Sequence, residues 1–168
     1  KGEVTHIDLA QRILTLSGGA FTPHITVGFE HLFLAPGAGV DLSRIPGMAE
    51  HAYLMRTVGD AMKLRAAIIS RMEEANLVND PALRRQLLSF VVVGGGYSGV
   101  ETAGQLQDLI RGVSRYYQNI GEHDASVTLV HSGERLLGML SESLGTYTGD
   151  CLTDMGVNIV FKCRVRAV

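Results

Sequence analysis

The sequence predicts an α/β fold, in which helices alternate with the strands of a parallel sheet and an antiparallel β-meander comes first. An apolar run at residues 90–93 is followed by helical periodicity from about 97 to 117. A second strand, a helix and a third strand are predicted at 126–130, 141–155 and 157–161. The order β-α-β-α-β is that of half of a doubly wound, Rossmann-like sheet.

Composition narrows the class of protein further. The chain has 168 residues, with 15 Lys and Arg against 17 Asp and Glu, so its formal net charge is −2. A near-neutral chain lacks the basic excess of nucleic-acid-binding surfaces, so no nucleic-acid partner is expected. Cys151 and Cys163 show no CxxC spacing, so neither a zinc site nor a redox dithiol is predicted. The 46% hydrophobic content excludes intrinsic disorder.

The meander is predicted from short alternating segments at 4–9, 12–16 and 24–27, separated by turn residues. A fourth segment, 31–35, is almost entirely apolar, as expected of a strand buried on both faces. It ends at a Pro-Gly-Ala-Gly stop at 36–39.

A long helix is predicted from the capping box that Thr57 forms with Asp60. The apolar residues expected on its core face are Val58, Met62, Ile68, Ile69, Met72 and Ala75. Asp80 and Pro81 then start a short helix, Asp80 as its cap and Pro81 at its first position. Residues 79–88 are the best candidate for a domain boundary.

The main functional motif is a glycine loop. Gly94, Gly96 and Gly99 match G-x-G-x-x-G directly between a predicted strand and helix, which is the context that gives this pattern meaning. In this interpretation Gly94 makes the tight turn, Gly96 allows a pyrophosphate to approach, and Gly99 permits close helix packing. The helix N-terminus attracts the phosphates. The alternative is a glycine-rich turn without a ligand.

Two further positions concern the nucleotide. The end of the second strand, where a carboxylate normally binds the ribose 2′-hydroxyl, holds His131. His131, Ser132 and Arg135 would suit a 2′-phosphate instead, whereas Glu134 still offers a carboxylate, so both interpretations stay open. Glu101, expected on the first helical turn, either contacts a cofactor or stabilises the helix start.

The stretch from Val92 to Leu106 resembles the NAD(P)H-binding segment of two-dinucleotide flavoprotein oxidoreductases, and among them the type II, non-proton-pumping NADH dehydrogenases. Residues 31–38, 45–52 and 108–126 resemble further segments of that family. The resemblance implies that residues 1–88 are the later part of an FAD-binding domain. It also implies that residues 89–168 are an incomplete NAD(P)H-binding domain, so the chain is expected to be a piece of a longer protein.

The resemblance also assigns site residues. Gly94, Gly96 and Gly99 would bind the pyrophosphate, and the loop residues Gly95, Tyr97 and Ser98 are further candidates for cofactor binding. Glu101 would lie near the nicotinamide, and Ala35 and Gly37 match flavin-contacting backbone positions. On the flavin side, Pro36 replaces a usual Thr. At the nucleotide site, His131 replaces a usual acidic residue, and this replacement leaves the choice between NADH and NADPH open.

The implied activity is hydride transfer from NAD(P)H to FAD, followed by electron transfer to a quinone, with no catalytic acid or base required in this segment. The isolated chain is expected to be inactive. The implied location is cytoplasmic, with peripheral contact to the inner face of the membrane through regions outside this chain, and a homodimer is an option. The alternatives are a disulfide, ferredoxin or sulfide:quinone reductase, or a non-catalytic NAD(P)H sensor.

Overall fold

A computed structural model describes residues 2–19, 24–37, 39–121 and 123–168. The chain divides into two compact units, Lys1–Val40 and Asp41–Val168, and each is described by itself. Among the described residues, no helix has the combined length and apolar character needed to cross a lipid bilayer.

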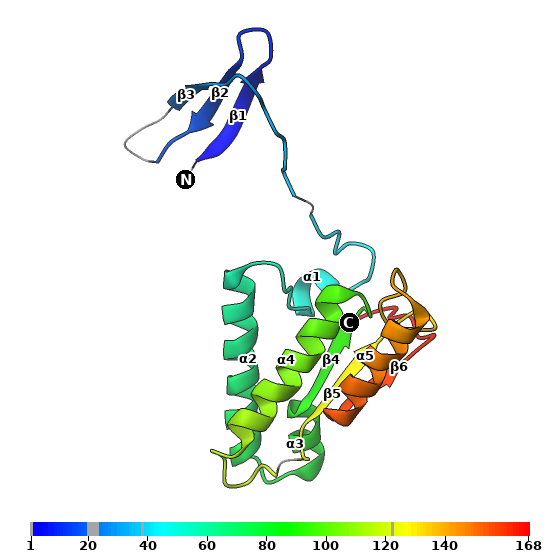
Figure 1. Ribbon diagram of the computed structural model, residues 1–168. Coiled ribbons are helices and arrows are strands. Elements are labelled where there is room, and N and C mark those ends of the chain that lie inside the picture. Colours follow the sequence, from blue (N-terminus) through cyan, green and yellow to red (C-terminus); the bar gives the residue numbers. More distant parts are fainter. Residues whose placement is uncertain (1, 20–23, 38, 122) are drawn as a thin grey trace. The chain divides into compact units, whose positions relative to one another are not determined.

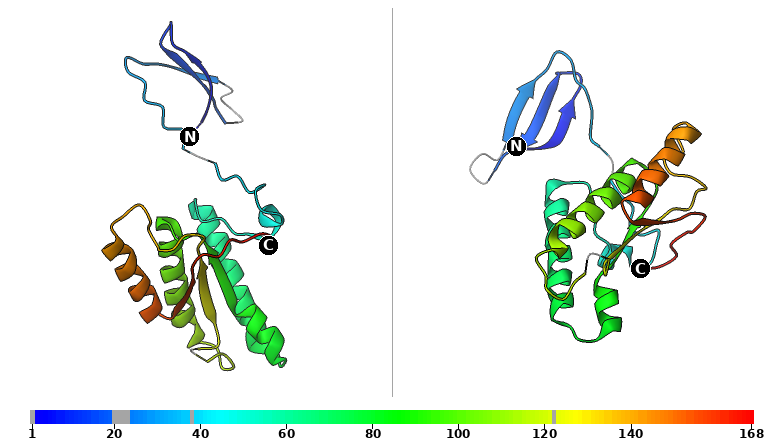
Figure 2. Two further views of the ribbon diagram at one scale, coloured as in Figure 1. Left: turned by 90° about the vertical axis from the view of Figure 1, so that its right-hand side faces the viewer. Right: turned by 60° about the horizontal axis from the view of Figure 1, so that its bottom comes forward.

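The first unit is a small antiparallel sheet. Its strands are β1 (Glu3–Asp8), β2 (Ile13–Ser17) and β3 (His24–Gly28), in the order β1-β2-β3, and they form the blue sheet of Figure 2. In the turn after β1, the Gln11 amide donates to Asp8 Oδ1 at 2.9 Å. The predicted meander is therefore confirmed.

The fourth predicted strand of this region, 31–35, is wrong. These residues form no strand, and the side chains of Phe33 and Leu34 are 92% and 70% exposed. A strand needs a neighbour to bond its backbone groups, and within the described residues no other strand pairs with this segment. Apolar composition alone therefore does not produce a strand here.

The second unit contains the predicted parallel sheet (Figure 1). The order along the chain is β4 (Ser89–Val93), α4 (Tyr97–Ser114), β5 (Ser126–Val130), α5 (Glu142–Asp154) and β6 (Val157–Val160). All neighbours pair in parallel, in the sheet order β4-β5-β6. Gly156, with φ of +95°, ends α5 as expected. The predicted β-α-β-α-β unit is confirmed.

Helices cover one face of this sheet. Val92, Leu129 and Ile159 occupy one row of the strand register and face the core, and α4 contacts all three strands. Val91 and Val93 point to the other face and are 62% and 45% exposed. β4 was expected to be a buried strand, and this expectation is wrong for the face that carries Val91 and Val93.

Helix α2 (Val58–Leu77) begins with the predicted capping box. The Asp60 amide donates to Thr57 Oγ1 at 3.1 Å, and the Thr57 amide donates to Asp60 Oδ2 at 2.9 Å. The hydrogen bonds from Thr57 are the largest cause of a lowered Asp60 pKa. Because the folded pKa is lowered, the carboxylate's stabilising effect is present at neutral pH and is lost as the pH falls through that pKa.

Three of the six apolar residues predicted for the core face of α2 are buried: Ile68, Met72 and Ala75. Met62 is 68% exposed, so its predicted core role is wrong, and so is that of Val58. At about 100° per residue, Met62 lies about 120° around the helix from Ile68 and therefore faces solvent.

The buried apolar residues of the second unit form one core, which consists of Ile68, Met72, Ala75, Leu87, Leu88, Ala103, Leu106, Ile110, Ile120, Val127, Leu129, Leu136, Leu137, Leu152 and Val157.

Removing the cap of α2 is expected to lower stability moderately. Thr57→Ala deletes the oxygen that accepts from the Asp60 amide, and loss of such a cap costs about 1 kcal/mol of unfolding free energy. Urea unfolding measures this loss. The control, Thr57→Ser, retains the oxygen and should stay close to the wild type; equal losses in both variants would show that the cap oxygen is not responsible.

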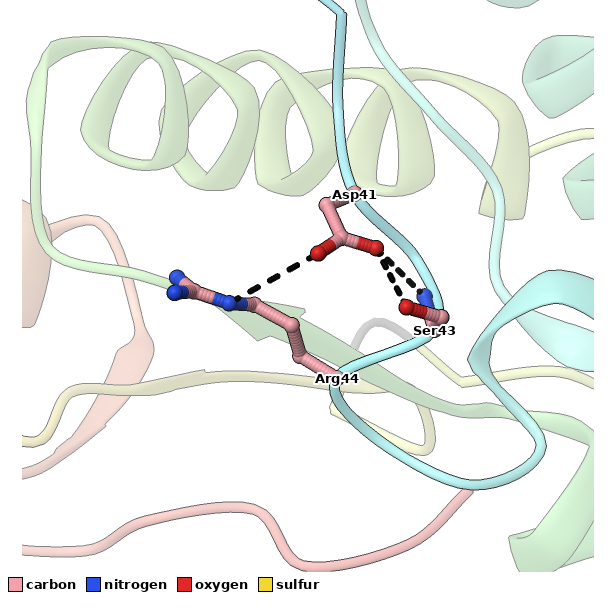
Figure 3. A network of polar contacts seen from close by, with 3 residues as sticks. All are labelled: Asp41, Ser43 and Arg44. Atoms are coloured by element: carbon pink, nitrogen blue, oxygen red, sulfur yellow. Dashed lines mark hydrogen bonds and ion pairs between the residues drawn. The ribbon is translucent and has the colours of Figure 1, made fainter.

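Shorter elements complete the second unit. At its start, the amide and hydroxyl of Ser43 donate to Asp41 Oδ1 at 3.0 and 2.6 Å, and Arg44 Nε lies 3.7 Å from Asp41 Oδ2 (Figure 3). These Ser43 hydrogen bonds lower the pKa of Asp41. Helix α1 (Met48–His51) follows, and helix α3 (Pro81–Leu87) begins with the expected Asp80 cap, whose Oδ1 accepts from the Ala82 amide at 2.8 Å.

The compact units divide at Val40, whereas the expected cofactor domains divide near residue 88. Helix α2 packs in the same core as the residues from 89 onward. Compact units and cofactor-binding domains need not coincide, so the boundary near 88 remains a prediction.

Candidate functional site: a glycine loop between β4 and α4

The glycine loop joins β4 to α4 and is fastened to the neighbouring strand. The Gly94 amide donates to the Val130 carbonyl at 2.9 Å, and the Leu137 amide donates to the Gly95 carbonyl at 2.8 Å. Helix α4 starts with Gly96 as N-cap, and no side chain caps it. Its first amides therefore lack side-chain partners and point out of the helix start, as an anion-binding helix N-terminus requires.

Two glycines of the motif are required by the fold itself. Gly94 has φ of +111°, a conformation that side chains disfavour. A Cβ on Gly99 would lie 1.7 Å from the Gly94 carbonyl oxygen. The expected tight turn at Gly94 and close packing at Gly99 are thus confirmed, and the group that approaches Gly99 is the loop's own backbone.

Gly96 differs from both. Its φ of −84° suits any residue, and a Cβ placed there would meet nothing within 4 Å. Neither a positive φ nor close packing requires a glycine at this position. The open space lies at the start of α4, where a ligand would come close to the backbone.

The middle glycine, Gly95, contacts His131. Its amide donates to His131 Nδ1 at 3.1 Å, and a Cβ on Gly95 would lie 2.7 Å from both His131 Cγ and Leu136 Cδ2. The structure therefore brings two predicted site residues together in a way that sequence reasoning missed. The only signal in the sequence is the uninterrupted triple glycine, in which the second position has no role in the motif.

Two of the other residues after β5 have polar partners outside the glycine loop. Arg135 Nη2 donates to the Gly138 carbonyl at 3.0 Å. Glu134 pairs with Lys162 at 2.8 Å, both being exposed. Ser132 is exposed. Of the residues predicted to surround a 2′-phosphate, His131 is the one whose side chain is hydrogen-bonded to the glycine loop.

Glu101 lies one turn further along α4 than expected. The helix begins at Tyr97, so Glu101 is in the second turn and not in the first. The field of the helix dipole falls off within the first turn, so the expected dipole stabilisation of this carboxylate is weaker. Glu101 is exposed, as are Tyr97 and Ser98 at the helix start.

The flavin-side residues Ala35 and Gly37 belong to the first unit. Both are exposed, and Gly37 has φ of +73°. Residues 33–37 form no regular element, so this segment presents no preformed cradle.

Two surface hollows lie away from the glycine loop, and neither is lined by residues 94–99. One, of about 550 Å³, is lined by residues of the C-terminal half of α4 such as Asp108 and Arg111, far along the helix from the glycine loop. The other, of about 440 Å³, is lined by Arg135 together with residues of α5 and β6. The open space at Gly96, in contrast, lies within the G-x-G-x-x-G loop itself.

A parallel sheet whose first strand runs through a glycine loop into a helix defines a Rossmann-like dinucleotide-binding fold. Residues 1–168 match the family described as "Pyridine nucleotide-disulphide oxidoreductase", and the chain belongs to this family.

Two named relatives within this family are similar to the chain in sequence. The chain is 31% identical to the "External alternative NADH-ubiquinone oxidoreductase, mitochondrial" of Yarrowia lipolytica, over 100% of this chain and 30% of that protein. It is 35% identical to the "Type II NADH:quinone oxidoreductase Ndh" of Mycobacterium tuberculosis, over 99% of this chain and 36% of that protein. The chain thus spans about a third of the length of these relatives.

Solved structures agree in fold. NDH2 from Plasmodium falciparum in complex with NADH matches with a TM-score of 0.83 at 23% identity, over 99% of this chain and 34% of that one. The water-forming NADH oxidase from Lactobacillus brevis matches with a TM-score of 0.61 at 18% identity, over 99% of this chain and 31% of that one. At these identities the likeness shows the Rossmann-like fold.

Proposed function

We propose that this chain supplies the pyridine-nucleotide-binding part of an FAD-dependent NAD(P)H:quinone oxidoreductase. The observation that carries the proposal is Gly96, a glycine that neither backbone nor packing requires, facing open space at the start of α4. The relatives named above, two quinone oxidoreductases, support the choice of acceptor.

Within the proposal, each loop residue has a physical task. Gly94 and Gly99 set the loop's shape, and Gly96 leaves room for the pyrophosphate against the backbone. The uncapped amides at Tyr97 and Ser98 and the helix dipole favour the phosphate charge. The bound nucleotide supplies the hydride, so the chain itself needs to bind, orient and exclude water.

The remaining assignments concern the longer protein. The assignment of FAD rests on family membership. Residues 33–37 are exposed and form no preformed binding site against which the fit of FAD could be judged. The same proposal includes quinone as the electron acceptor and a domain boundary near residue 88. It also includes a homodimer and a peripheral membrane contact made outside this chain.

The test is an assay of the full-length protein with FAD, NADH, NADPH and a soluble quinone. We expect nucleotide oxidation coupled to quinone reduction. Reduction of a disulfide or a ferredoxin but not of a quinone would refute the acceptor. Nucleotide binding without transfer to any acceptor would indicate a sensor, and failure to bind either nucleotide would overturn the site.

Arg135 allows a separate test of nucleotide choice. If its guanidinium reads a 2′-phosphate, Arg135→Ala should weaken NADPH binding about tenfold and leave NADH unchanged, since a hydrogen bond to a charged group is worth about that much. Parallel titrations with both nucleotides measure the difference, and Arg135→Lys, which retains the charge, is the control. Because Arg135 also bonds the Gly138 carbonyl, equal losses for both nucleotides would mean that it only supports its loop.

A further inference from the structure

The contact between His131 and Gly95 assigns the histidine a task that its position at the end of β5 does not suggest. We propose that His131 is a positioning residue of the nucleotide site, which holds the glycine loop in place through Nδ1 and does not bind the nucleotide with that atom. The inference rests on the proposed function for the identity of the ligand, whereas the contact itself belongs to the chain alone.

The hydrogen bond determines the chemical state of the imidazole. Nδ1 accepts from the Gly95 amide at 3.1 Å, so it carries a lone pair and the ring proton is on Nε2. A second proton on Nδ1 would remove this acceptor. In this contact Nδ1 is occupied as an acceptor, and it is not available to donate to a 2′-phosphate.

The ring also occupies a defined space between two glycines. A Cβ on Gly95 would lie 2.7 Å from His131 Cγ, and a Cβ on Gly133 would lie 2.7 Å from His131 Nε2. Both glycines are thus explained by the ring itself. A side chain at either position would push the imidazole away from the loop.

The backbone of His131 is also hydrogen-bonded within the protein. Its amide donates to the Val160 carbonyl at 2.8 Å, and its carbonyl accepts from the Cys163 amide at 3.1 Å. His131 therefore links the glycine loop, through its ring, to the end of β5 and, through its backbone, to the end of β6. Since the Gly95 carbonyl also accepts from Leu137, both polar backbone groups of Gly95 are engaged within the protein, and phosphate binding falls to the amides that follow.

Two amide variants separate the two nitrogens of the ring. The oxygen of Asn takes the place of Nδ1, whereas the amide of Gln reaches the place of Nε2. If His131 acts through Nδ1, His131→Asn should keep the NADH dissociation constant within about threefold of the wild type. His131→Gln should weaken NADH binding about tenfold, the scale of one lost hydrogen bond. Titrations of the full-length protein with NADH measure both.

A second measurement needs neither a variant nor a nucleotide. In the wild-type full-length protein labelled with ¹⁵N, we expect an unprotonated Nδ1, a protonated Nε2 and a coupling through the hydrogen bond between Nδ1 and the Gly95 amide nitrogen. In His131→Asn the Gly95 amide resonance should stay near its wild-type position, and in His131→Gln it should shift. Urea unfolding of both variants identifies any general loss of stability.

The outcomes are distinguishable. A protonated Nδ1, or tighter NADH binding by the Gln variant than by the Asn variant, would overturn the positioning role. Wild-type binding in both variants would overturn it as well, while leaving the nucleotide site intact. If the resonances are as expected but neither NADH nor NADPH binds the wild type, the proposed function fails and the loop-holding contact stands.

Discussion

Replacing Gly96 by valine is expected to weaken NADH and NADPH binding strongly and to leave the fold intact. The backbone of Gly96 has φ of −84°, which valine adopts freely, and a Cβ there meets no atom within 4 Å. The new side chain would instead occupy the space in which a pyrophosphate approaches the start of α4. Overfilling a close-fitting site costs about 1–3 kcal/mol, so we expect the dissociation constants to rise about a hundredfold.

Titration of the full-length protein with both nucleotides measures this change, and urea unfolding checks the fold. Gly149→Ala is the matched control, because Gly149 of α5 also faces open space but lies outside the loop. It should bind both nucleotides normally. Unchanged binding in Gly96→Val would remove the main support for a nucleotide site at this loop.

Replacing Gly99 by alanine is expected to have the opposite signature, a loss of stability of more than about 3 kcal/mol. The added Cβ would lie 1.7 Å from the Gly94 carbonyl oxygen and 2.9 Å from its carbonyl carbon. Both obstacles are backbone atoms, which cannot rotate away as a side chain would. The loop or the start of α4 must therefore shift, and nucleotide binding should fall as a consequence.

Urea unfolding tests this expectation, with Gly104→Ala on the same helix as control. A Cβ on Gly104 would meet Leu152 Cδ2 at 3.5 Å, an ordinary contact. Replacing a mid-helix glycine by alanine typically stabilises by up to about 1 kcal/mol. An unfolding midpoint for Gly99→Ala equal to that of the wild type would contradict the close packing between Gly99 and the Gly94 carbonyl.

The features that the sequence predicts best are local. The capping box of α2 and the Asp80-Pro81 start of α3 depend on residues at most a few positions apart, and the structure has both. The same holds for the β4–loop–α4 unit, where an apolar run, three glycines and a helical pattern follow one another directly. In each case the stabilising hydrogen bond or backbone conformation lies within one segment.

The predictions that are wrong depend on what surrounds a segment. The apolar run at 31–35 is no strand because none of the described strands pairs with it, and Val91 and Val93 are exposed because helices cover only the other face of β4. Met62 is apolar like a core residue, but its position around the axis of α2 places its side chain in solvent. Burial is a property of the assembled fold, so composition alone does not determine it.

By itself, the sequence determined that a Rossmann-like unit with a G-x-G-x-x-G loop lies in this chain, because strand, loop and helix are encoded by consecutive residues. Only the tertiary structure decided what each glycine is for. The φ of Gly94, the carbonyl that faces Gly99 and the open space at Gly96 separate two glycines that the fold requires from one for which we propose a ligand. Likewise, only the pairing of β4 with β5 brings His131 against Gly95, 36 positions away in the chain.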